Sequence, residues 1–175
     1  MSKIVADTSV IINGQLIDQI EAGSVRNSEI IIPQAVFDEL QSQASSKKEQ
    51  GFVGLEKIKK LKELSGSFGL IIVTKGAHPS IDDIKFASSG RIDALITDVA
   101  KENDAILYTS DNVQYLVAQA KDLETVFLQP IVKNETLEFL KFFDDQTMSV
   151  HLKENQKPLA KKGKPGTFVL TDISD

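Results

Sequence analysis

The chain has 175 residues, of which 41% are hydrophobic and 26% are charged. This length and composition suffice for one folded enzyme domain with some residues to spare, and they argue against a second full domain. The absence of cysteine excludes a disulfide framework and a cysteine-based zinc site. A formal net charge of -5 argues against a general electrostatic attraction to nucleic acid, so we expect any contact with nucleic acid to be local.

The sequence also indicates where the protein resides. No apolar run approaches the roughly 20 residues that are needed to span a bilayer. Met1 to Ile4 lead directly into a predicted strand, not into a secretion signal. We therefore expect a cytoplasmic protein that has no membrane partner.

Apolar runs alternate with amphipathic stretches over the first 130 residues. Strands that alternate with helices imply right-handed crossovers and a mostly parallel sheet. The sequence therefore predicts an α/β fold with a central, mostly parallel sheet flanked by helices. In chain order we predict a strand at 3–6, a helix at 9–21, a strand at 29–32, a helix at 34–44, a lysine-rich helix around 52–64, a strand at 70–74, short helical material at 81–88, a helix at 92–102, a strand at 105–108, a helix at 113–120 and a strand at 125–128.

Residues 131–175 have a different pattern. An apolar stretch at 137–143 predicts a C-terminal helix. Strands are predicted at 147–152 and 167–170, and a basic loop rich in glycine and proline at 161–166 joins them as a β-hairpin. We interpret 1–130 as the main domain and 131–175 as a connector.

Four acidic residues lie where such a sheet would bring them to one edge. Asp7 and Asp111 come just after the predicted strands 3–6 and 105–108, and Glu39 and Asp93 lie on apolar-periodic helical stretches. Ligands of parallel α/β sheets bind at the carboxyl ends of the strands. Carboxylates gathered without cations need a metal, and hard divalent cations such as Mg²⁺ prefer oxygen ligands. The pattern therefore predicts a carboxylate metal site.

Such a site can cleave a phosphodiester without a basic side chain. Two ions roughly 4 Å apart can activate an attacking water and stabilise the leaving oxygen. The two histidines, His78 and His151, lie in no motif-like setting, and we interpret His78 as an ordinary loop residue and His151 as a structural strand residue. The four acids are thus the favoured catalytic residues.

Each acid also has a simpler interpretation. Asp7 and Asp111 could each cap the helix that follows, and capping alone would explain either one. Glu39 could be a solvent-facing helix residue, and Asp93 could interact with the N-terminal end of its helix dipole. Four such coincidences at matching positions are less expected than any one of them.

The order of these acids resembles the PIN domain family of metal-dependent ribonucleases over about residues 1–130. The resemblance rests on Asp7-Thr8-Ser9, Glu39, Gly90-x-x-Asp93-Ala94 and Thr109-Ser110-Asp111. A narrower resemblance, to the archaeal PIN-domain ATPases, rests on the segments 7–14, 43–44, 51–55 and 110–114. The tail at 147–166 resembles the connector that precedes their P-loop ATPase domain, which a KH domain often follows.

The resemblance implies a three-layer PIN-like fold and a role for each site residue. It implies that Asp7, Glu39, Asp93 and Asp111 are catalytic and hold Mg²⁺ or Mn²⁺. It implies that a second set of side chains orients these carboxylates or contacts the substrate, namely Ser9, Asn13, Thr109, Asn112, Lys47 and Lys48. Related sequences often have Asp at the position of Asn13 and a further acid shortly after Asp111, so the number of bound ions stays open.

Three functions follow. The favoured one is a metal-dependent endonuclease that cleaves single-stranded nucleic acid, RNA before DNA. The chain lacks the Gly-x4-Gly-Lys-Ser/Thr motif, so we expect it to be the N-terminal part of a larger PIN-ATPase. The second is therefore a nucleic-acid-binding and oligomerisation module of that ATPase, which would self-associate through 137–143 and would form a homo-oligomer as the full-length protein. The third is a stand-alone toxin-type ribonuclease, against which the long C-terminal segment argues.

Overall fold

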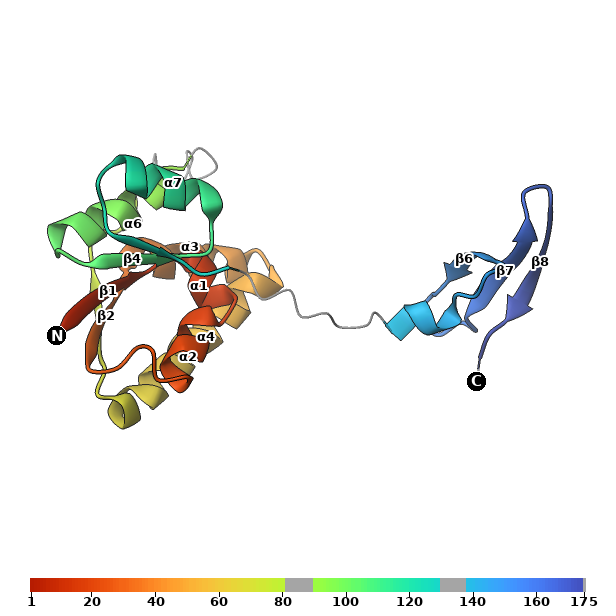
Figure 1. The fold of residues 1–175 in the computed structure, drawn as a ribbon, viewed down its shortest axis with the longest axis horizontal. Coiled ribbons are helices and arrows are strands. Elements are labelled where there is room, and N and C mark those ends of the chain that lie inside the picture. Colours follow the sequence, from red (N-terminus) through yellow and green to blue (C-terminus); the bar gives the residue numbers. More distant parts are fainter. Residues whose placement is uncertain (81–89, 130–137, 175) are drawn as a thin grey trace. The chain divides into compact units, whose positions relative to one another are not determined.

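The computed structural model describes residues 1–80, 90–129 and 138–174. The chain divides into two units, Met1–Pro130 and Ile131–Asp175, and Figure 1 shows the elements of each. None of the helices within these described ranges is long and apolar enough to cross a membrane. The predicted helical material at 81–88 lies outside the described residues, as does the first residue of the predicted stretch at 137–143.

The first unit is built on a five-stranded, all-parallel sheet in the order β3-β2-β1-β4-β5, which confirms the predicted fold class. Residues Ile4 to Ala6 of β1 and Ile30 to Ile32 of β2 are buried consecutively. Consecutive burial means that both faces of the sheet are covered. The strands are β1 (Ser2–Ala6), β2 (Ser28–Pro33), β3 (Ile71–Lys75), β4 (Ile106–Thr109) and β5 (Thr125–Phe127).

Helices cover the sheet on two sides. The described helices of this unit are α1 (Thr8–Ile12), α2 (Gln15–Glu21), α3 (Gln34–Ser45), α4 (Glu49–Phe68), α6 (Arg91–Glu102) and α7 (Asn112–Ala120). Figure 1 shows α6 and α7 on one side and α1, α2 and α4 on the other. The chain runs outward from β1 through β2 to β3 and then returns to β4 and β5, so right-handed crossovers place the two sets of helices on opposite faces.

The predicted helix at 9–21 is wrong in one respect, because the structure breaks it into α1 and α2. Gly14 lies between them with φ 74°, a left-handed conformation that glycine adopts at little cost. The prediction missed this break because Ile11, Leu16 and Ile20 continue the apolar period across it. The break ends α1 at Asn13, whose side-chain amide donates to Ser110 Oγ, in the loop after β4, at 3.0 Å.

Helices α3 and α4 approach each other closely at two glycines. A Cβ atom at Gly51 would lie 2.3 Å from the backbone nitrogen of Ala44, and one at Gly54 would lie 2.4 Å from Leu40 Cδ2. No other residue permits this approach without a shift of the helices. The packing therefore holds α3, which carries Glu39, against α4.

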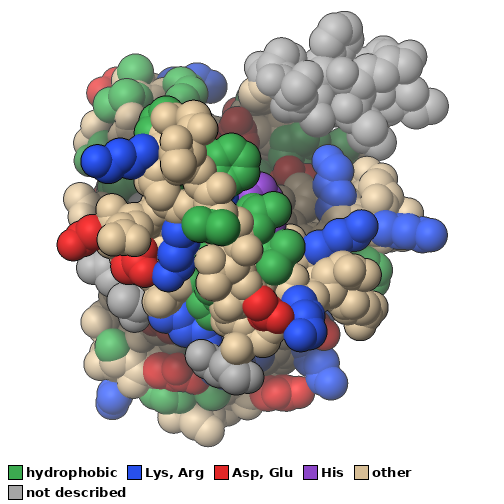
Figure 2. Space-filling view, turned by 90° about the vertical axis from the view of Figure 1, so that its right-hand side faces the viewer, with side chains coloured by type: hydrophobic (Ala, Val, Ile, Leu, Met, Phe, Trp, Pro, Cys, Tyr) green, Lys and Arg blue, Asp and Glu red, His purple; other side chains and the backbone are tan. Residues whose placement is uncertain are grey.

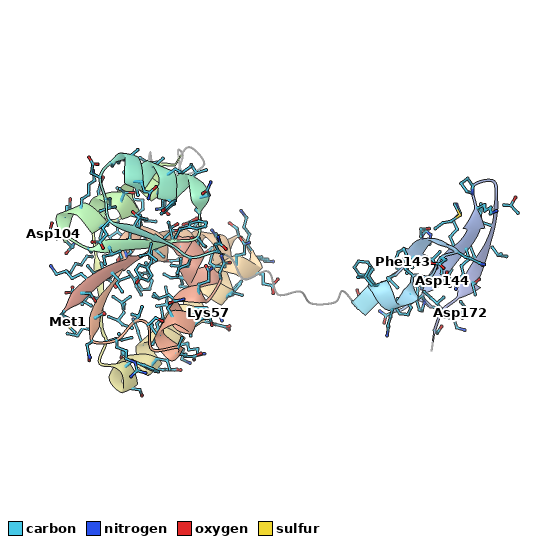
Figure 3. All side chains as sticks on the ribbon, viewed as in Figure 1. Met1, Lys57, Asp104, Phe143, Asp144 and Asp172 are labelled. Atoms are coloured by element: carbon cyan, nitrogen blue, oxygen red, sulfur yellow. The ribbon has the colours of Figure 1, made fainter. Side chains whose placement is uncertain are left out.

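The second unit contains a short 3-10 helix, η2 (Glu138–Phe142), and a three-stranded antiparallel sheet in the order β6-β7-β8. The strands are β6 (Thr147–His151), β7 (Leu159–Lys164) and β8 (Thr167–Asp172). The predicted hairpin is wrong in one respect, because β7 lies between the two predicted strands and contains Lys161 and Lys162, which the sequence pattern assigns to a loop. Lysine and glycine have low strand propensity, so the sequence does not indicate this strand. In the structure, both lysines have a partner. Lys162 pairs with Asp144 at 2.6 Å, and the Lys161 ammonium lies 3.7 Å from the ring centroid of Phe168; Figure 3 labels Asp144 on this unit.

Candidate metal centre

Asp7 follows β1 directly and is almost fully buried, with 3% of its surface exposed. Its carboxylate caps α1 by accepting hydrogen bonds from the backbone nitrogen of Ser9 at 3.3 Å and from Ser9 Oγ. Thr109 Oγ1, at the end of β4, donates to the same oxygen, Oδ2, at 2.9 Å. Burial raises the pKa of Asp7, and it outweighs these hydrogen bonds, which lower it.

A further partner of Asp7, Gln114, was missed by the sequence analysis. Its side chain is buried in α7, and with its amide nitrogen turned toward the carboxylate that nitrogen lies 3.0 Å from Asp7 Oδ1, 2.9 Å from Asp7 Oδ2 and 2.9 Å from Thr109 Oγ1. The opposite amide orientation would set its oxygen against the carboxylate, which only accepts hydrogen bonds. No local pattern in the sequence marks Gln114, because its burial and its contact with Asp7 arise only in the folded protein.

Asp111 lies two residues beyond β4 and is exposed. Its Oδ1 caps α7 by accepting from the backbone nitrogens of Val113 at 2.7 Å and Gln114 at 3.0 Å, and its own backbone nitrogen donates to Thr109 Oγ1 at 3.0 Å. Both Asp7 and Asp111 therefore make the capping contacts that the simpler interpretation required. Capping does not exclude a ligand role, because each carboxylate has two oxygens with several lone pairs.

Glu39 is half-buried in α3 and is tied to the beginning of α1. Thr8 Oγ1 donates to Glu39 Oε2 at 2.7 Å, and Gln43 Nε2 donates to Glu39 Oε1 at 3.1 Å. Glu39 is thus not a freely solvated helix residue. The neighbouring Asp38 has other partners, since Gln34 Nε2 donates to its Oδ1 at 3.0 Å and His78 Nδ1 lies 2.8 Å from its Oδ2.

Asp93 lies in the first turn of α6, which Gly90 begins with φ 80°. Burial, as the largest cause, and the charges of Asp7, Asp111 and Glu39 together raise the pKa of Asp93 to about 6. The other three carboxylates are therefore near enough to repel Asp93. This position in the first turn also places Asp93 at the positive end of the helix dipole, as the simpler interpretation expected.

The four carboxylates do not form a closed ligand set as they stand. Within 1–80, 90–129 and 138–174, no three Asp, Glu, His or Cys side chains are grouped closely enough to hold one metal ion. The charges of the other three carboxylates nevertheless raise the pKa of Asp93. An all-carboxylate donor set under mutual repulsion suits a hard divalent cation, which would neutralise the charge and draw the side chains together.

The other predicted residues differ in how directly hydrogen bonds connect them to the four acids. Asn13 Nδ2 donates to Ser110 Oγ at 3.0 Å, and the backbone nitrogen of Ser110 donates to Ser9 Oγ at 2.9 Å, so Asn13 is coupled to Asp7 through two residues. Asn112 is the exposed first residue of α7. Lys47 and Lys48 lie exposed in the turn between α3 and α4, and in the described part of the chain no recorded hydrogen bond or ion pair joins them to the four acids.

The sequence profile of the PIN domain matches residues 4–121. The chain belongs to the PIN domain family. PIN domains are typically metal-dependent nucleases that use divalent ions such as Mg²⁺ or Mn²⁺. The match confirms the family resemblance drawn from the order of the acids, and it covers the whole carboxylate centre.

Two curated archaeal relatives match nearly the whole chain. The uncharacterized KH and PIN-domain containing protein MJ1533 of Methanocaldococcus jannaschii is 43% identical over 99% of this chain and 27% of its own length. The Holliday junction branch migration ATPase PINA of Sulfolobus acidocaldarius is 28% identical over 97% of this chain and 31% of its own length. The chain thus spans about a third or less of each relative.

A solved structure supports the fold of the first unit. It is a domain of a functionally unknown protein from Methanocaldococcus jannaschii, which is 40% identical and superposes with a TM-score of 0.69. The match covers 74% of this chain and 92% of the other. The three-layer arrangement is therefore shared with a relative that is similar in sequence.

Proposed function

We propose that this PIN domain is a divalent-metal-dependent endonuclease that hydrolyses phosphodiester bonds in single-stranded nucleic acid, with RNA favoured over DNA. The observation that supports the proposal is the electrostatic effect of three acids on a fourth, since the charges of Asp7, Asp111 and Glu39, together with burial, raise the pKa of Asp93. Asp7, Glu39, Asp93 and Asp111 would hold Mg²⁺ or Mn²⁺. The ion would supply an activated water and neutralise charge on the phosphate.

Within this proposal the surrounding residues hold the carboxylates in place. Ser9, Thr109 and Gln114 donate to Asp7 and fix the position of its carboxylate. Thr8 and Gln43 do the same for Glu39. Groups that orient ligands in this way are commonly worth 10- to 100-fold in metal affinity or activity.

The substrate must approach an acidic protein. Its formal net charge is -5, so attraction of a phosphate backbone depends on local cations and on the bound metal. The exposed Lys47 and Lys48 would supply such local charge near the end of α3. Asn13 and Asn112 would contact the nucleic-acid strand at the mouth of the site.

A second candidate function is a nucleic-acid-binding and oligomerisation module of a longer PIN-ATPase, with little or no cleavage. It is favoured by large apolar side chains that are exposed on the second unit, namely Phe139, Leu140, Phe143, Met148, Leu152, Phe168, Val169 and Leu170. Figure 2 shows apolar side chains at the surface among those of lysine and arginine. Exposed apolar clusters commonly mark interfaces, so residues 131–175 would serve as a connector and the full-length protein would be a homo-oligomer.

Cleavage of end-labelled single-stranded RNA and DNA tests the two candidates. The purified chain is incubated with Mn²⁺, Mg²⁺ or EDTA, beside an Asp7→Asn variant whose folding is checked by circular dichroism. The nuclease proposal predicts cleavage that requires a metal and Asp7, faster on RNA. Folded protein that binds RNA but leaves it intact under every metal would favour the binding module.

A further inference from the structure

A cleft with a mixed apolar and polar lining lies near the four candidate acids. Its volume is about 440 Å³, and its lining includes Gln34, Phe37, Asp38, Gln41, Thr74 and His78. Thr74 is close to the carboxyl end of β3, so the cleft lies at the same edge of the sheet as Asp7, which follows β1. In the strand order β3-β2-β1, two strand spacings, about 10 Å, separate the two positions. One single strand of nucleic acid could therefore reach both.

The imidazole of His78 is held in this cleft by a carboxylate. Its Nδ1 lies 2.8 Å from Asp38 Oδ2, and Gln34 Nε2 donates to Asp38 Oδ1 at 3.0 Å. The His78 side chain is nevertheless 77% exposed, so a ring face and its second nitrogen are accessible to a ligand. Asp38 and His78 come from α3 and from the segment after β3, which shows that the pair is assembled by the fold.

An aromatic ring, that of Phe37, is part of the cleft lining, and a cation lies close to this ring. Phe37 packs partly against the core, and Lys62 Nζ of α4 lies 5.9 Å from the centroid of its ring. Proteins bind single-stranded nucleic acid by stacking bases on aromatic side chains and by placing cations along the backbone. The Asp38 carboxylate would repel a phosphate inside the cleft, whereas a base can use the carboxylate, imidazole and amide groups for hydrogen bonds.

We propose that this cleft, defined by Phe37, Asp38 and His78, binds one nucleobase of the single-stranded substrate adjacent to the cleavage site. The proposal rests on the proposed nuclease function for its choice of ligand. Phe37 and His78 supply stacking surfaces, Gln34 and Gln41 supply amide donors and acceptors, and Lys62 meets the flanking phosphate. Asp38 pairs with Gln34 and His78, and it is not among the acids whose charges raise the pKa of Asp93, so we treat Asp38 and His78 as separate from the four candidate ligands.

Binding without cleavage tests the cleft. In the Asp7→Asn background, fluorescence anisotropy measures the Kd for a short, labelled single-stranded RNA of mixed sequence. Phe37→Leu retains apolar volume in the core, and His78→Ala changes an exposed side chain. Each is expected to weaken binding about 5- to 100-fold, the range for one lost base stack. The matched controls are Phe52→Leu, at an exposed phenylalanine of α4, and His151→Ala in the second unit, which should stay within about twofold.

An abasic RNA separates base recognition from electrostatic attraction. A set of RNAs is used in which each member lacks one base. One member should bind the Asp7→Asn protein as weakly as intact RNA binds the protein that also carries Phe37→Leu. Adding Phe37→Leu should not weaken the binding of this abasic RNA further. Unchanged affinity in both cleft variants overturns the proposal, even if the wild-type chain cleaves RNA. Weakened binding in both variants, with no cleavage by the wild type under any metal, would support base binding in the cleft and contradict the proposed nuclease function.

Discussion

Thr109 Oγ1 donates a hydrogen bond to Asp7 Oδ2 across 2.9 Å, and both groups are buried. The same hydroxyl accepts from the backbone nitrogen of Asp111 at 3.0 Å. One side chain at the end of β4 therefore holds two of the four candidate ligands. Because β1 and β4 are neighbouring parallel strands, the register of the sheet sets the spacing of these carboxylates.

Replacement of Thr109 by valine keeps the shape of the side chain but removes its hydroxyl. We expect Thr109→Val to reduce metal-dependent cleavage about 10- to 100-fold, because Asp7 would lose an orienting donor. Thr125→Val on β5 is the matched control, since the Thr125 hydroxyl donates only to the nearby Leu123 carbonyl oxygen. Equal activity of both variants would show that the Thr109 hydroxyl does not position the carboxylates.

The raised pKa of Asp93 predicts a pH-dependent stability of the metal-free protein. Folding raises this pKa from 3.8 to about 6, so between these values the folded state binds more protons than the unfolded chain. Stability should therefore fall as pH rises from about 4 to about 6. Asp93→Asn should remove about 1–2 kcal/mol of this fall, a figure that allows for solvent screening of a half-buried group. Urea unfolding in EDTA at several pH values measures it, and an unchanged slope in the variant would contradict the assignment.

Divalent ions should stabilise the folded protein if the carboxylates share them. Binding to the folded state alone raises the free energy of unfolding by about 2.7 kcal/mol at a hundredfold excess over Kd. We expect Mn²⁺ to raise the Tm of the wild-type chain and to have much less effect on Asp111→Asn. Thermal denaturation with Mn²⁺ or EDTA makes the comparison, and Ca²⁺ serves as a second hard cation. An equal rise in both proteins would place the ion elsewhere.

Much of the fold was predictable because its signals are local. Consecutive apolar residues in β1 and β2 indicated strands that are buried on both faces, and the alternation of strands with helices indicated a parallel sheet. The break at Gly14 was not predicted, because the apolar period runs through it. β7 was missed because the partners of Lys161 and Lys162, Phe168 and Asp144, lie on other elements.

Only part of the candidate site was predictable from the sequence. Strand ends identify Asp7 and Asp111 as neighbours, since all strands of a parallel sheet end at one edge. The contacts of Thr8 with Glu39 and of Gln114 with Asp7 join elements that are distant in sequence, and no local pattern marks them. The pairing of Asp38 with His78 also depends on how α3 packs beside the end of β3, and we had interpreted His78 as an ordinary loop residue.

The contact between α3 and α4 gives a prediction about stability alone. Gly51→Ala would place a Cβ atom 2.3 Å from the backbone nitrogen of Ala44 and should lower the free energy of unfolding by about 1–3 kcal/mol. Gly66 lies in the same helix with nothing within 4 Å of its Cβ position, so Gly66→Ala should raise stability by about 0.5–1 kcal/mol. Urea denaturation of both variants measures the two signs. Equal effects would mean that the helices do not meet at Gly51.

A comparison of two aspartates on one helix tests the central claim most directly. Asp93 and Asp98 both lie on α6, but Asp98 is exposed, whereas Asp93 is half-buried and the charges of the other three carboxylates raise its pKa. Cleavage of single-stranded RNA in Mn²⁺ should be lost in Asp93→Asn and retained in Asp98→Asn, while both variants fold like the wild type. Cleavage that survives in a clean preparation of Asp93→Asn would contradict a carboxylate metal centre at this site.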